Sequence, residues 1–338
     1  MSSVRVGRRP LGETGLVGSQ LGIGLAALGR PAYITLGRER DLGADRAPEE
    51  LYARAAQVLD VARAAGVRSI DVARSYGRAE EFLARWLSER AVARDQVVVS
   101  SKWGYAYTAG WRIDVAVHEE KELSLSRFRT QLGETRGHLE GWLGLYQIHS
   151  ATMESLCLSN GELLRALVEG RRGGAYRAVG LTVSGPRSAE TIAQALGARV
   201  DGERVFDVVQ ATFNCLEPSL APILARAHDA GLGVMIKEAF ANGRLTEANH
   251  RAADQPMLDR LRRRAGALGA SVDQVALAFV LAQGFADVVL SGAATQGQLA
   301  SHLDTLELRL DGATREVIAG VAEPSDRYWA ERSSLPWT

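Results

Sequence analysis

Asp71, Tyr76, Lys102 and His149 are residue types that together can move a proton, and the first two lie close together in IDVARSYGRAE, residues 70–80. A tyrosine hydroxyl, whose ordinary pKa is near 10, is a poor acid at neutral pH. An ammonium group about 4 Å away stabilises the phenolate by up to about 4 kcal/mol at an effective dielectric constant of about 20. That energy lowers the pKa of the tyrosine by as much as about three.

Each member of such a group has its own role. Asp71 would hold Lys102 charged and oriented, and His149 would hydrogen-bond the substrate oxygen or share the proton. The group would then donate a proton to an oxygen on which negative charge develops, as when a hydride adds to a carbonyl. The alternative is structural, with Asp71 as a helix cap and Tyr76 as a packing residue, and only the rest of the chain decides between the two.

Short apolar segments alternate with longer amphipathic ones along the chain and set the positions of these residues. The expected strands are 21–28, 69–73, 97–103, 145–150, 178–184, 208–214, 233–239 and 287–293. Helical patterns such as 48–66, 78–90 and 219–231 lie between them, which indicates a parallel sheet covered on both faces. Eight such units in 338 residues predict the α/β class and a (β/α)8 TIM barrel, as one domain over residues 1–338.

A doubly wound open sheet is the alternative fold, because GIGLAA (22–27) offers a G-x-G-x-x-A turn. Pro31 follows soon after, where a long helix would have to run, so we reject the motif as a dinucleotide fingerprint. Residues 4–20 alternate like a short β-hairpin around LGETG. We expect this hairpin to plug the N-terminal end, or bottom, of the barrel.

The carboxyl ends of the expected strands carry polar residues, and this is the end of such barrels where chemistry takes place. In chain order they are Asp71, Lys102, His149, Thr182 with Ser184, Gln210 with Asn214, Lys237 with Glu238, and Ser291 with Gly292. Only three of the forty basic residues are lysines, and two of the three end strands. A lysine kept in so arginine-rich a chain is a candidate for work that arginine cannot do, such as titrating.

Composition excludes several classes of function. Forty acidic and forty basic residues cancel, which removes the bulk electrostatic case for nucleic acid or an anionic membrane as partner. No apolar run approaches the roughly 18 residues of a membrane span and no signal pattern is seen, so we expect a cytoplasmic protein with a small-molecule substrate. Cys157 and Cys215 form no metal spacing; we expect no metal and two buried thiols.

The segment DVARSYGRAE (71–80) resembles the D-x-A-x-x-Y-G-x-x-E signature of the aldo-keto reductases. The similarity continues, in the family's order and over nearly the whole chain, through LGETGL, SSKWG, LYQIHS, QATFN, GLGVMIKEAFANGRLT and LSGAATQGQL. The resemblance implies a barrel that binds NADPH, less often NADH, in extended form across the strand ends. It also implies Tyr76 as the acid/base, Lys102 and Asp71 as its tuning pair, and His149 as the orienting residue.

The cofactor-binding set that the resemblance implies departs from the family's usual residues at several positions. Its members are Thr182, Gln210, Lys237, Glu238, Arg244, Ser291, Gly292 and Gln298. Thr182 stands where the family usually has serine, Gln210 matches the amide-binding glutamine, and Lys237 replaces the aromatic that stacks on the nicotinamide. Residues 291–308 contain no Lys or Arg to pair with an adenosine 2′-phosphate, so binding of NADPH is expected to be weakened more than binding of NADH.

Several roles stay open at this point. Lys237 with Glu238 is either a partly buried ion pair or a contact for cofactor phosphate or an acidic substrate. Arg244 is either a surface residue or a pyrophosphate contact. The aromatic residues after the third strand either line or cover a substrate pocket or pack within their loop; they are Trp103, Tyr105, Tyr107 and Trp111. The five histidines other than His149 receive no role.

We therefore expect an oxidoreductase that passes a hydride between a nicotinamide cofactor and an aldehyde, ketone or sugar-like alcohol, with Tyr76 handling the proton. One alternative is a non-redox barrel enzyme, such as a lyase, isomerase or dehydratase, that uses the same acid–base group. A second is a regulatory subunit that binds a nucleotide without turning it over. The complete set of four proton-handling residues argues against the second, because a binding protein has no need of all four.

Overall fold

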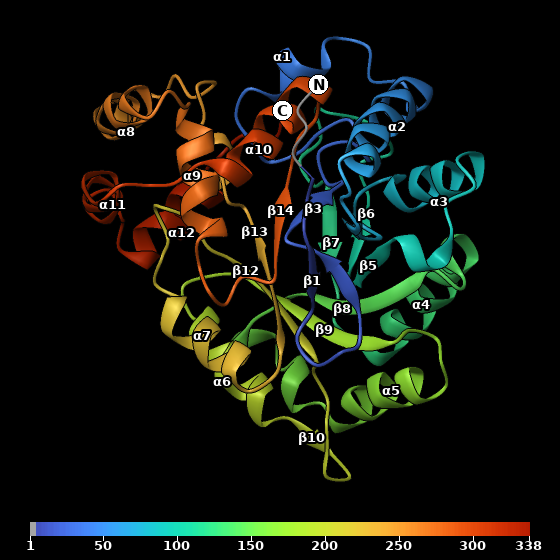
Figure 1. The fold of residues 1–338 in the computed structure, drawn as a ribbon. Helices are drawn as coiled ribbons and strands as arrows, with labels where there is room; N and C mark the ends of the chain where they lie inside the picture. Colours follow the sequence, from blue (N-terminus) through green and yellow to red (C-terminus); the bar gives the residue numbers. More distant parts are fainter. Residues whose placement is uncertain (1–4) are drawn as a thin grey trace.

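The structure, a computed structural model, describes residues 5–338. Eight strands form a closed parallel barrel in the order β3-β4-β5-β8-β9-β12-β13-β14, with β14 pairing back onto β3 (Figure 1). Their bounds are β3 Leu21–Gly24, β4 Ser69–Asp71, β5 Val98–Trp103, β8 Leu143–Ala151, β9 Ala178–Val183, β12 Val208–Thr212, β13 Gly233–Lys237 and β14 Val288–Ser291. The predicted TIM barrel is confirmed, and each expected strand overlaps an observed one.

Helices surround the barrel (Figure 1). Their buried apolar residues recur at helical spacing. In α3, for example, Phe82, Leu83, Trp86 and Leu87 are all buried. Those that follow the strands are α2 Pro48–Ala64, α3 Ala79–Glu89, α4 Leu125–Leu139, α5 Gly161–Arg172, α6 Ser188–Gly197, α7 Ala221–Asp229, α9 Val272–Leu281 and α10 Gln296–Asp304. Four more, α1 Arg38–Leu42, α8 Gln255–Ala267, α11 Gly312–Ala319 and α12 Ser325–Ser333, lie in the connections and the C-terminal segment.

A hairpin closes the N-terminal end of the barrel, as predicted. Strand β1 (Arg8–Pro10) pairs antiparallel with β2 (Val17–Ser19), while residue 4 of the predicted 4–20 hairpin lies outside the described residues. Leu11 and Leu16 of the turn join a buried cluster with residues that point into the barrel, including Leu145 and Met235. The hairpin is therefore part of the core that holds the eight strands together.

The connection after β5 is more ordered than the sequence suggested. Tyr105 and Tyr107 are the first and last residues of a short strand, β6 (Tyr105–Tyr107), which pairs antiparallel with β7 (Glu119–Lys121). A second small hairpin joins β10 (Arg199–Val200) to β11 (Glu203–Arg204). Both cysteines are buried, as expected. Within residues 5–338 no single helix is long and apolar enough to cross a membrane. One sharply bent pair of helical segments, 252–267 with 272–281, has the length and apolar composition of a membrane span only when the two are taken together.

Candidate active site

A cavity of about 460 Å³ opens at the carboxyl ends of the barrel strands. The structure brings nine of the twelve predicted site residues to its wall: Asp71, Tyr76, His149, Gln210, Lys237, Glu238, Ser291, Gly292 and Gln298. Strand ends of a parallel barrel meet at one face, and this explains why residues so far apart in sequence converge. Lys102 lies behind the wall and reaches the site through Asp71.

Asp71, the last residue of β4, is the centre of a buried hydrogen-bond network. Lys102 Nζ forms an ion pair with Oδ2 of Asp71 and donates a second hydrogen bond to Val72 O at 2.9 Å. The other carboxylate oxygen, Oδ1, accepts from Ser100 Oγ at 2.6 Å, Gln210 Nε2 at 3.1 Å and Gln147 Nε2 at 3.4 Å. Because both charges of the pair are removed from water, the neighbouring donors are needed to stabilise it.

Tyr76 lies in the turn that joins β4 to α3, and its ring faces the cavity. The ring centroid is 4.7 Å from Lys102 Nζ and 5.6 Å from the His149 ring, which meets it edge-on. The following residue, Gly77, has a φ of +58°, and a Cβ there would lie 2.5 Å from Gly29 O. Only glycine fits this turn, so the Tyr-Gly pair is required to aim the tyrosine inward.

The electrostatic tuning differs from the sequence-based expectation. Burial and the Asp71 carboxylate raise the pKa of Tyr76 well above its ordinary value, while the nearby Arg30 guanidinium opposes the rise. We predicted that Lys102 would lower the pKa of Tyr76. In the structure the Lys102 charge is neutralised by Asp71 in direct contact, so the pair presents little net positive charge to the phenol.

His149, near the end of β8, stays uncharged at neutral pH. Burial, with Lys102 and Lys237 nearby, holds its pKa well below the ordinary value. Its Nδ1 atom is buried and has no hydrogen-bond partner among the residues that the structure describes. A neutral imidazole facing the cavity can donate one hydrogen bond to a bound oxygen without adding a charge.

Lys237 and Glu238, at the end of β13, form a wider cluster than the isolated pair considered from sequence. Lys237 Nζ donates to Thr212 Oγ1 at 2.8 Å and lies 3.8 Å from Glu238. The main partner of Glu238 is Arg332 of α12, whose Nε lies 3.0 and 3.1 Å from the two carboxylate oxygens. Burial lowers the pKa of Lys237 to about 8. Although burial opposes it, Arg332 with Lys237 lowers the pKa of Glu238 to about 2.

The remaining predicted cofactor residues divide into two groups. Gln298 lies at the cavity wall, where its amide donates to Asp41 Oδ2 at 2.8 Å, and Ser291 shares a 2.8 Å hydrogen bond with His302. Thr182 and Arg244 do not line the cavity. Thr182 accepts from Ser150 N at 2.7 Å in the barrel wall, and Arg244, only 2% exposed, is bound by Asp254 and Glu323. Arg244 is thus a buried structural ion pair, which corrects the surface alternative.

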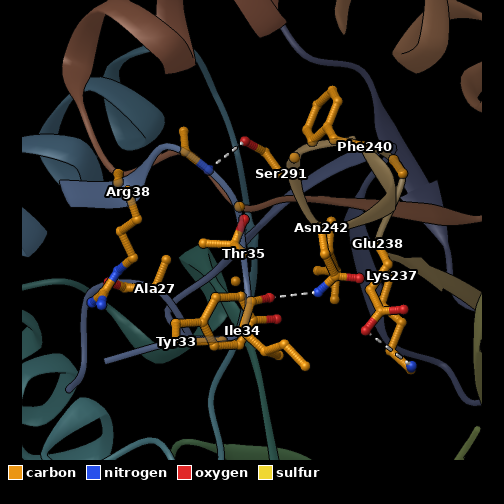
Figure 2. A pocket seen from close by; sticks show the side chains of 18 of the residues that line it. Ala27, Tyr33, Ile34, Thr35, Arg38, Lys237, Glu238, Phe240, Asn242 and Ser291 are labelled. Atoms are coloured by element: carbon orange, nitrogen blue, oxygen red, sulfur yellow. Dashed lines mark hydrogen bonds and ion pairs between the residues drawn. The ribbon is translucent and has the colours of Figure 1, made fainter. Parts of the chain in front are cut away.

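Part of the wall comes from residues that sequence reasoning missed. They are Arg30, Tyr33, Asp41, Glu119, His302, Arg332 and Trp337. Arg30 and Tyr33 belong to residues 30–38, here called the strap. The strap is tied down by Asn242 Nδ2 to Ile34 O at 2.8 Å and by Tyr33 N to Thr338 O at 3.0 Å. Figure 2 shows Tyr33, Ile34 and Thr35, which line the cavity, in the middle of the view, with Asn242, Glu238 and Lys237 to one side.

The sequence held weak signals for some of these residues. Lys121, the third lysine, donates to Ser150 O at 2.7 Å, so all three lysines of the chain lie around His149. Of the aromatic residues after β5, Tyr105 lines the cavity at 4.9 Å from the His149 ring. Trp103 packs on Phe128 and Trp111 on Phe82. Within residues 5–338 no cluster of three or more His, Cys, Asp or Glu is arranged to hold a metal ion.

A barrel with titratable groups gathered at its carboxyl face is the arrangement of a barrel enzyme, and comparison with known proteins supplies the family. Residues 21–322 match the Aldo/keto reductase family, and the chain belongs to it. The predicted family and the oxidoreductase class are therefore confirmed.

Individual relatives are distant. "Protein tas" of Escherichia coli is 26% identical over 297 residues, which is 75% of this chain and 84% of that protein, and the Shigella flexneri protein of the same name matches equally. An aldo-keto reductase of Bacillus halodurans, solved in its holo form, superposes with a TM-score of 0.73 at 19% identity, covering 95% of this chain and 97% of that one. A Pseudomonas aeruginosa protein assigned to the aldo-keto reductases superposes with a TM-score of 0.63 at 22% identity, covering 90% of this chain and 99% of that one.

Proposed function

We propose that the protein reduces an aldehyde or ketone, or oxidises the corresponding alcohol, with Tyr76 as the general acid or base. The observation that carries the proposal is the placement of Tyr76, His149 and the Lys102–Asp71 pair at one end of a single cavity. A nicotinamide cofactor, typical of this family, supplies or accepts the hydride when bound. The chain's own residues then have to bind the substrate oxygen and move one proton.

The neutral His149 suits the first of these tasks. It donates a hydrogen bond to the carbonyl oxygen and so holds that oxygen against the Tyr76 hydroxyl. In carbonyl reduction Tyr76 gives its proton to the oxygen as negative charge develops there, and in alcohol oxidation it takes the proton back. The raised pKa of Tyr76 keeps the hydroxyl protonated at neutral pH, which favours the reductive direction.

The cavity wall fits an uncharged adenosine ribose better than a phosphorylated one. Gln298 lies beside the Asp41 carboxylate, and residues 291–308 contain no Lys or Arg. A carboxylate accepts hydrogen bonds from ribose hydroxyls and repels a phosphate dianion. We therefore propose NADH rather than NADPH as the preferred cofactor, with Gln210, Ser291, Gly292 and Gln298 as its contacts.

The Tyr76→Phe variant tests the catalytic role. Loss of the hydroxyl should lower turnover of a carbonyl probe such as para-nitrobenzaldehyde by about 10²-fold or more, since it removes the general acid. Tyr105→Phe is the matched control, because Tyr105 also lines the cavity beside His149; its effect should be much smaller. Wild-type turnover by Tyr76→Phe would disprove the role of Tyr76.

Quenching of tryptophan fluorescence by NADH and by NADPH tests the cofactor assignment independently of any substrate. NADH should bind at micromolar concentration, and NADPH should bind at least about tenfold more weakly because of the missing basic partner. The Asp41→Asn variant should reduce the difference between the affinities for NADH and for NADPH. Equal or tighter binding of NADPH by the wild type would contradict the proposed preference.

A further inference from the structure

Arg30, at the start of the strap, is a buried arginine that none of the catalytic roles above uses. The residue is only 2% exposed, and it lines the cavity. Its Cζ atom lies 5.3 Å from the ring centroid of Tyr76, 5.5 Å from that of Tyr33 and 4.9 Å from that of Trp337. A guanidinium at such distances from aromatic rings makes cation–π contacts, which are stronger where water is excluded.

The same guanidinium also fixes the backbone next to Tyr76. Its Nη1 donates to Ser75 O at 2.8 Å and to Glu119 Oε2 at 2.7 Å. Its Nε is buried and has no partner within the described part of the chain. Ser75 directly precedes Tyr76, so Arg30 holds both the turn and the ring of the tyrosine.

Two cations therefore lie near the Tyr76 ring, and their counterions differ. Lys102 is matched at direct contact by Asp71, and both side chains are almost fully buried, at 0% and 3% exposure. Arg30 is matched by Glu119, whose side chain is 20% exposed and belongs to the β6–β7 hairpin outside the barrel. Glu119 also contacts Arg30 directly, at 2.7 Å, but the effect of Arg30 on the pKa of Tyr76 is larger than the opposing effect of Glu119, so the charge of Arg30 is only partly offset at the phenol.

We propose that Arg30 is a positioning residue for Tyr76: Arg30 orients the tyrosine ring and stabilises its phenolate. Glu119, the counterion of Arg30, determines how strongly Arg30 stabilises the phenolate. The inference rests on the proposed role of Tyr76 as acid or base. Arg30 then supplies the positive charge that Lys102, bound to Asp71, no longer offers. Removing Arg30 and removing the charge of Glu119 should act on Tyr76 with opposite sign, which a purely structural contact would not do.

The other groups that face Tyr76 stay in place in both variants. They are Tyr33 of the strap, Asp71 of β4, Lys102 of β5, His149 of β8 and Glu238 of β13. Among the charged groups that act on the pKa of Tyr76, Arg30 lowers it whereas Asp71, Glu119 and Glu238 raise it. The sign expected for each variant is therefore defined: upward for loss of Arg30 and downward for loss of the Glu119 charge.

The test is a titration of the full-length protein in which every tyrosine is replaced by meta-fluorotyrosine, followed by fluorine NMR. The fluorine lowers the pKa of each phenol, and the Tyr76→Phe variant identifies the Tyr76 resonance. An opposite charge at this distance typically shifts a pKa by one or more, so Arg30→Met should raise the pKa of residue 76 by about one. At a fixed pH that is a tenfold loss of phenolate.

Arg30→Lys should titrate close to the wild type, and Glu119→Gln should lower the pKa of residue 76. Arg85→Met is the matched control, because Arg85 lies 3.8 Å from the ring of Tyr52, far from the cavity; it should leave residue 76 unchanged. Opposite shifts in Arg30→Met and Glu119→Gln support the proposal, and an Arg30→Met protein that titrates as the wild type overturns it.

If Arg30→Met fails to fold, Glu119→Gln decides alone: a lower pKa of residue 76 supports the proposal and an unchanged pKa overturns it. The outcome is separable from that of the proposed function. Wild-type turnover by Tyr76→Phe would remove the catalytic role of Tyr76, whereas these titrations report the electrostatic effect of Arg30 whether or not Tyr76 acts in catalysis.

Discussion

At the scale of single residues, the Asp71 carboxylate connects most of the site. It accepts hydrogen bonds from four side chains on three other barrel strands: Lys102, Ser100, Gln147 and Gln210. Gln210, which the family pattern assigns to the nicotinamide amide, thus donates a hydrogen bond from its side-chain amide to Asp71. Under the proposed function the carboxylate would orient a cofactor contact as well as the lysine, and proton transfer would then be connected with cofactor binding.

Asp71→Asn should destabilise the protein strongly, because it leaves the ammonium of Lys102 buried without a counterion. Breaking a buried ion pair from one side typically costs about 3–5 kcal/mol. Denaturant unfolding of Asp71→Asn and of the double variant Asp71→Asn, Lys102→Met measures the effect. The double variant should regain part of the lost free energy of unfolding, and a double variant less stable than the single one would contradict this account.

Lys237 gives the site a titratable charge close to neutral pH. With its pKa lowered to about 8, the amine is protonated below that pH and neutral above it. If Lys237 contacts a cofactor phosphate or an acidic substrate, binding should weaken as the pH rises through about 8. Cofactor titrations across this range should show the loss in the wild type, no such step in Lys237→Met, and a step moved to higher pH in Lys237→Arg.

At the scale of elements, the Arg332–Glu238 pair attaches helix α12 to the end of strand β13. The pKa of Glu238 is about 2 in the folded protein against 4.5 ordinarily. A depressed carboxyl pKa adds stability that is complete above the unfolded value and lost as the pH falls through the folded value. The pair should therefore contribute up to about 3 kcal/mol at neutral pH, lost between about 4.5 and 2.

Glu238→Gln tests this attachment. The difference in free energy of unfolding between wild type and variant should be largest at neutral pH and shrink as the pH falls from 4.5 toward 2. Glu331→Gln is a matched control on the same helix, because Glu331 pairs with Arg251 at a half-exposed position. A difference for Glu238→Gln that stays constant with pH would mean that Arg332 does not depress this pKa.

At the scale of the whole molecule, the N-terminal hairpin closes the barrel at the end opposite to the cavity. Gly12 in its turn has a φ of +52°, and a Cβ there would lie 2.2 Å from Gly233 N. Gly15 has a φ of +71° with its nearest neighbour at 3.9 Å. Gly12→Ala should cost roughly 3 kcal/mol or more in denaturant unfolding, whereas Gly15→Ala should cost about 1 kcal/mol from backbone strain alone.

Equal stabilities of the two alanine variants would mean that the hairpin does not press against β13. Turnover of the folded Gly12→Ala protein serves as a second readout. Because the turn lies at the far end of the barrel, the variant should keep its kcat at temperatures where it remains folded.

The fold and the convergence of the candidate proton-handling residues could be predicted because a parallel barrel relates sequence to space in a simple way. Asp71, Lys102 and His149 each follow an apolar strand, and strand ends in such a barrel meet at one face. Gly77 marked the turn that carries Tyr76. No comparable rule places the strap or α12, whose residues reach the site from positions far along the chain.

The predictions that failed depended on side-chain partners. Arg244 is paired with Asp254 and Glu323, the second of them 79 residues away, and nothing in the segment around it announces that pairing. The pKa of Tyr76 is raised rather than lowered: the predicted pairing of Lys102 with Asp71 is present, but burial and the Asp71 carboxylate, whose effect on the tyrosine was not foreseen, raise that pKa. Arg30 and Arg332 were overlooked because thirty-six other arginines and lysines outside the strand ends looked alike in the sequence.

The distribution of the three lysines has a practical consequence for handling the protein. Lys102 is fully buried and Lys237 is only 17% exposed, whereas Lys121, on the hairpin beside His149, is exposed. Among the side chains, an amine-reactive reagent would therefore find its most accessible target at the rim of the cavity. Coupling through lysine side chains, routine for attaching proteins to beads or sensor chips, would therefore attach this enzyme at the rim of its cavity.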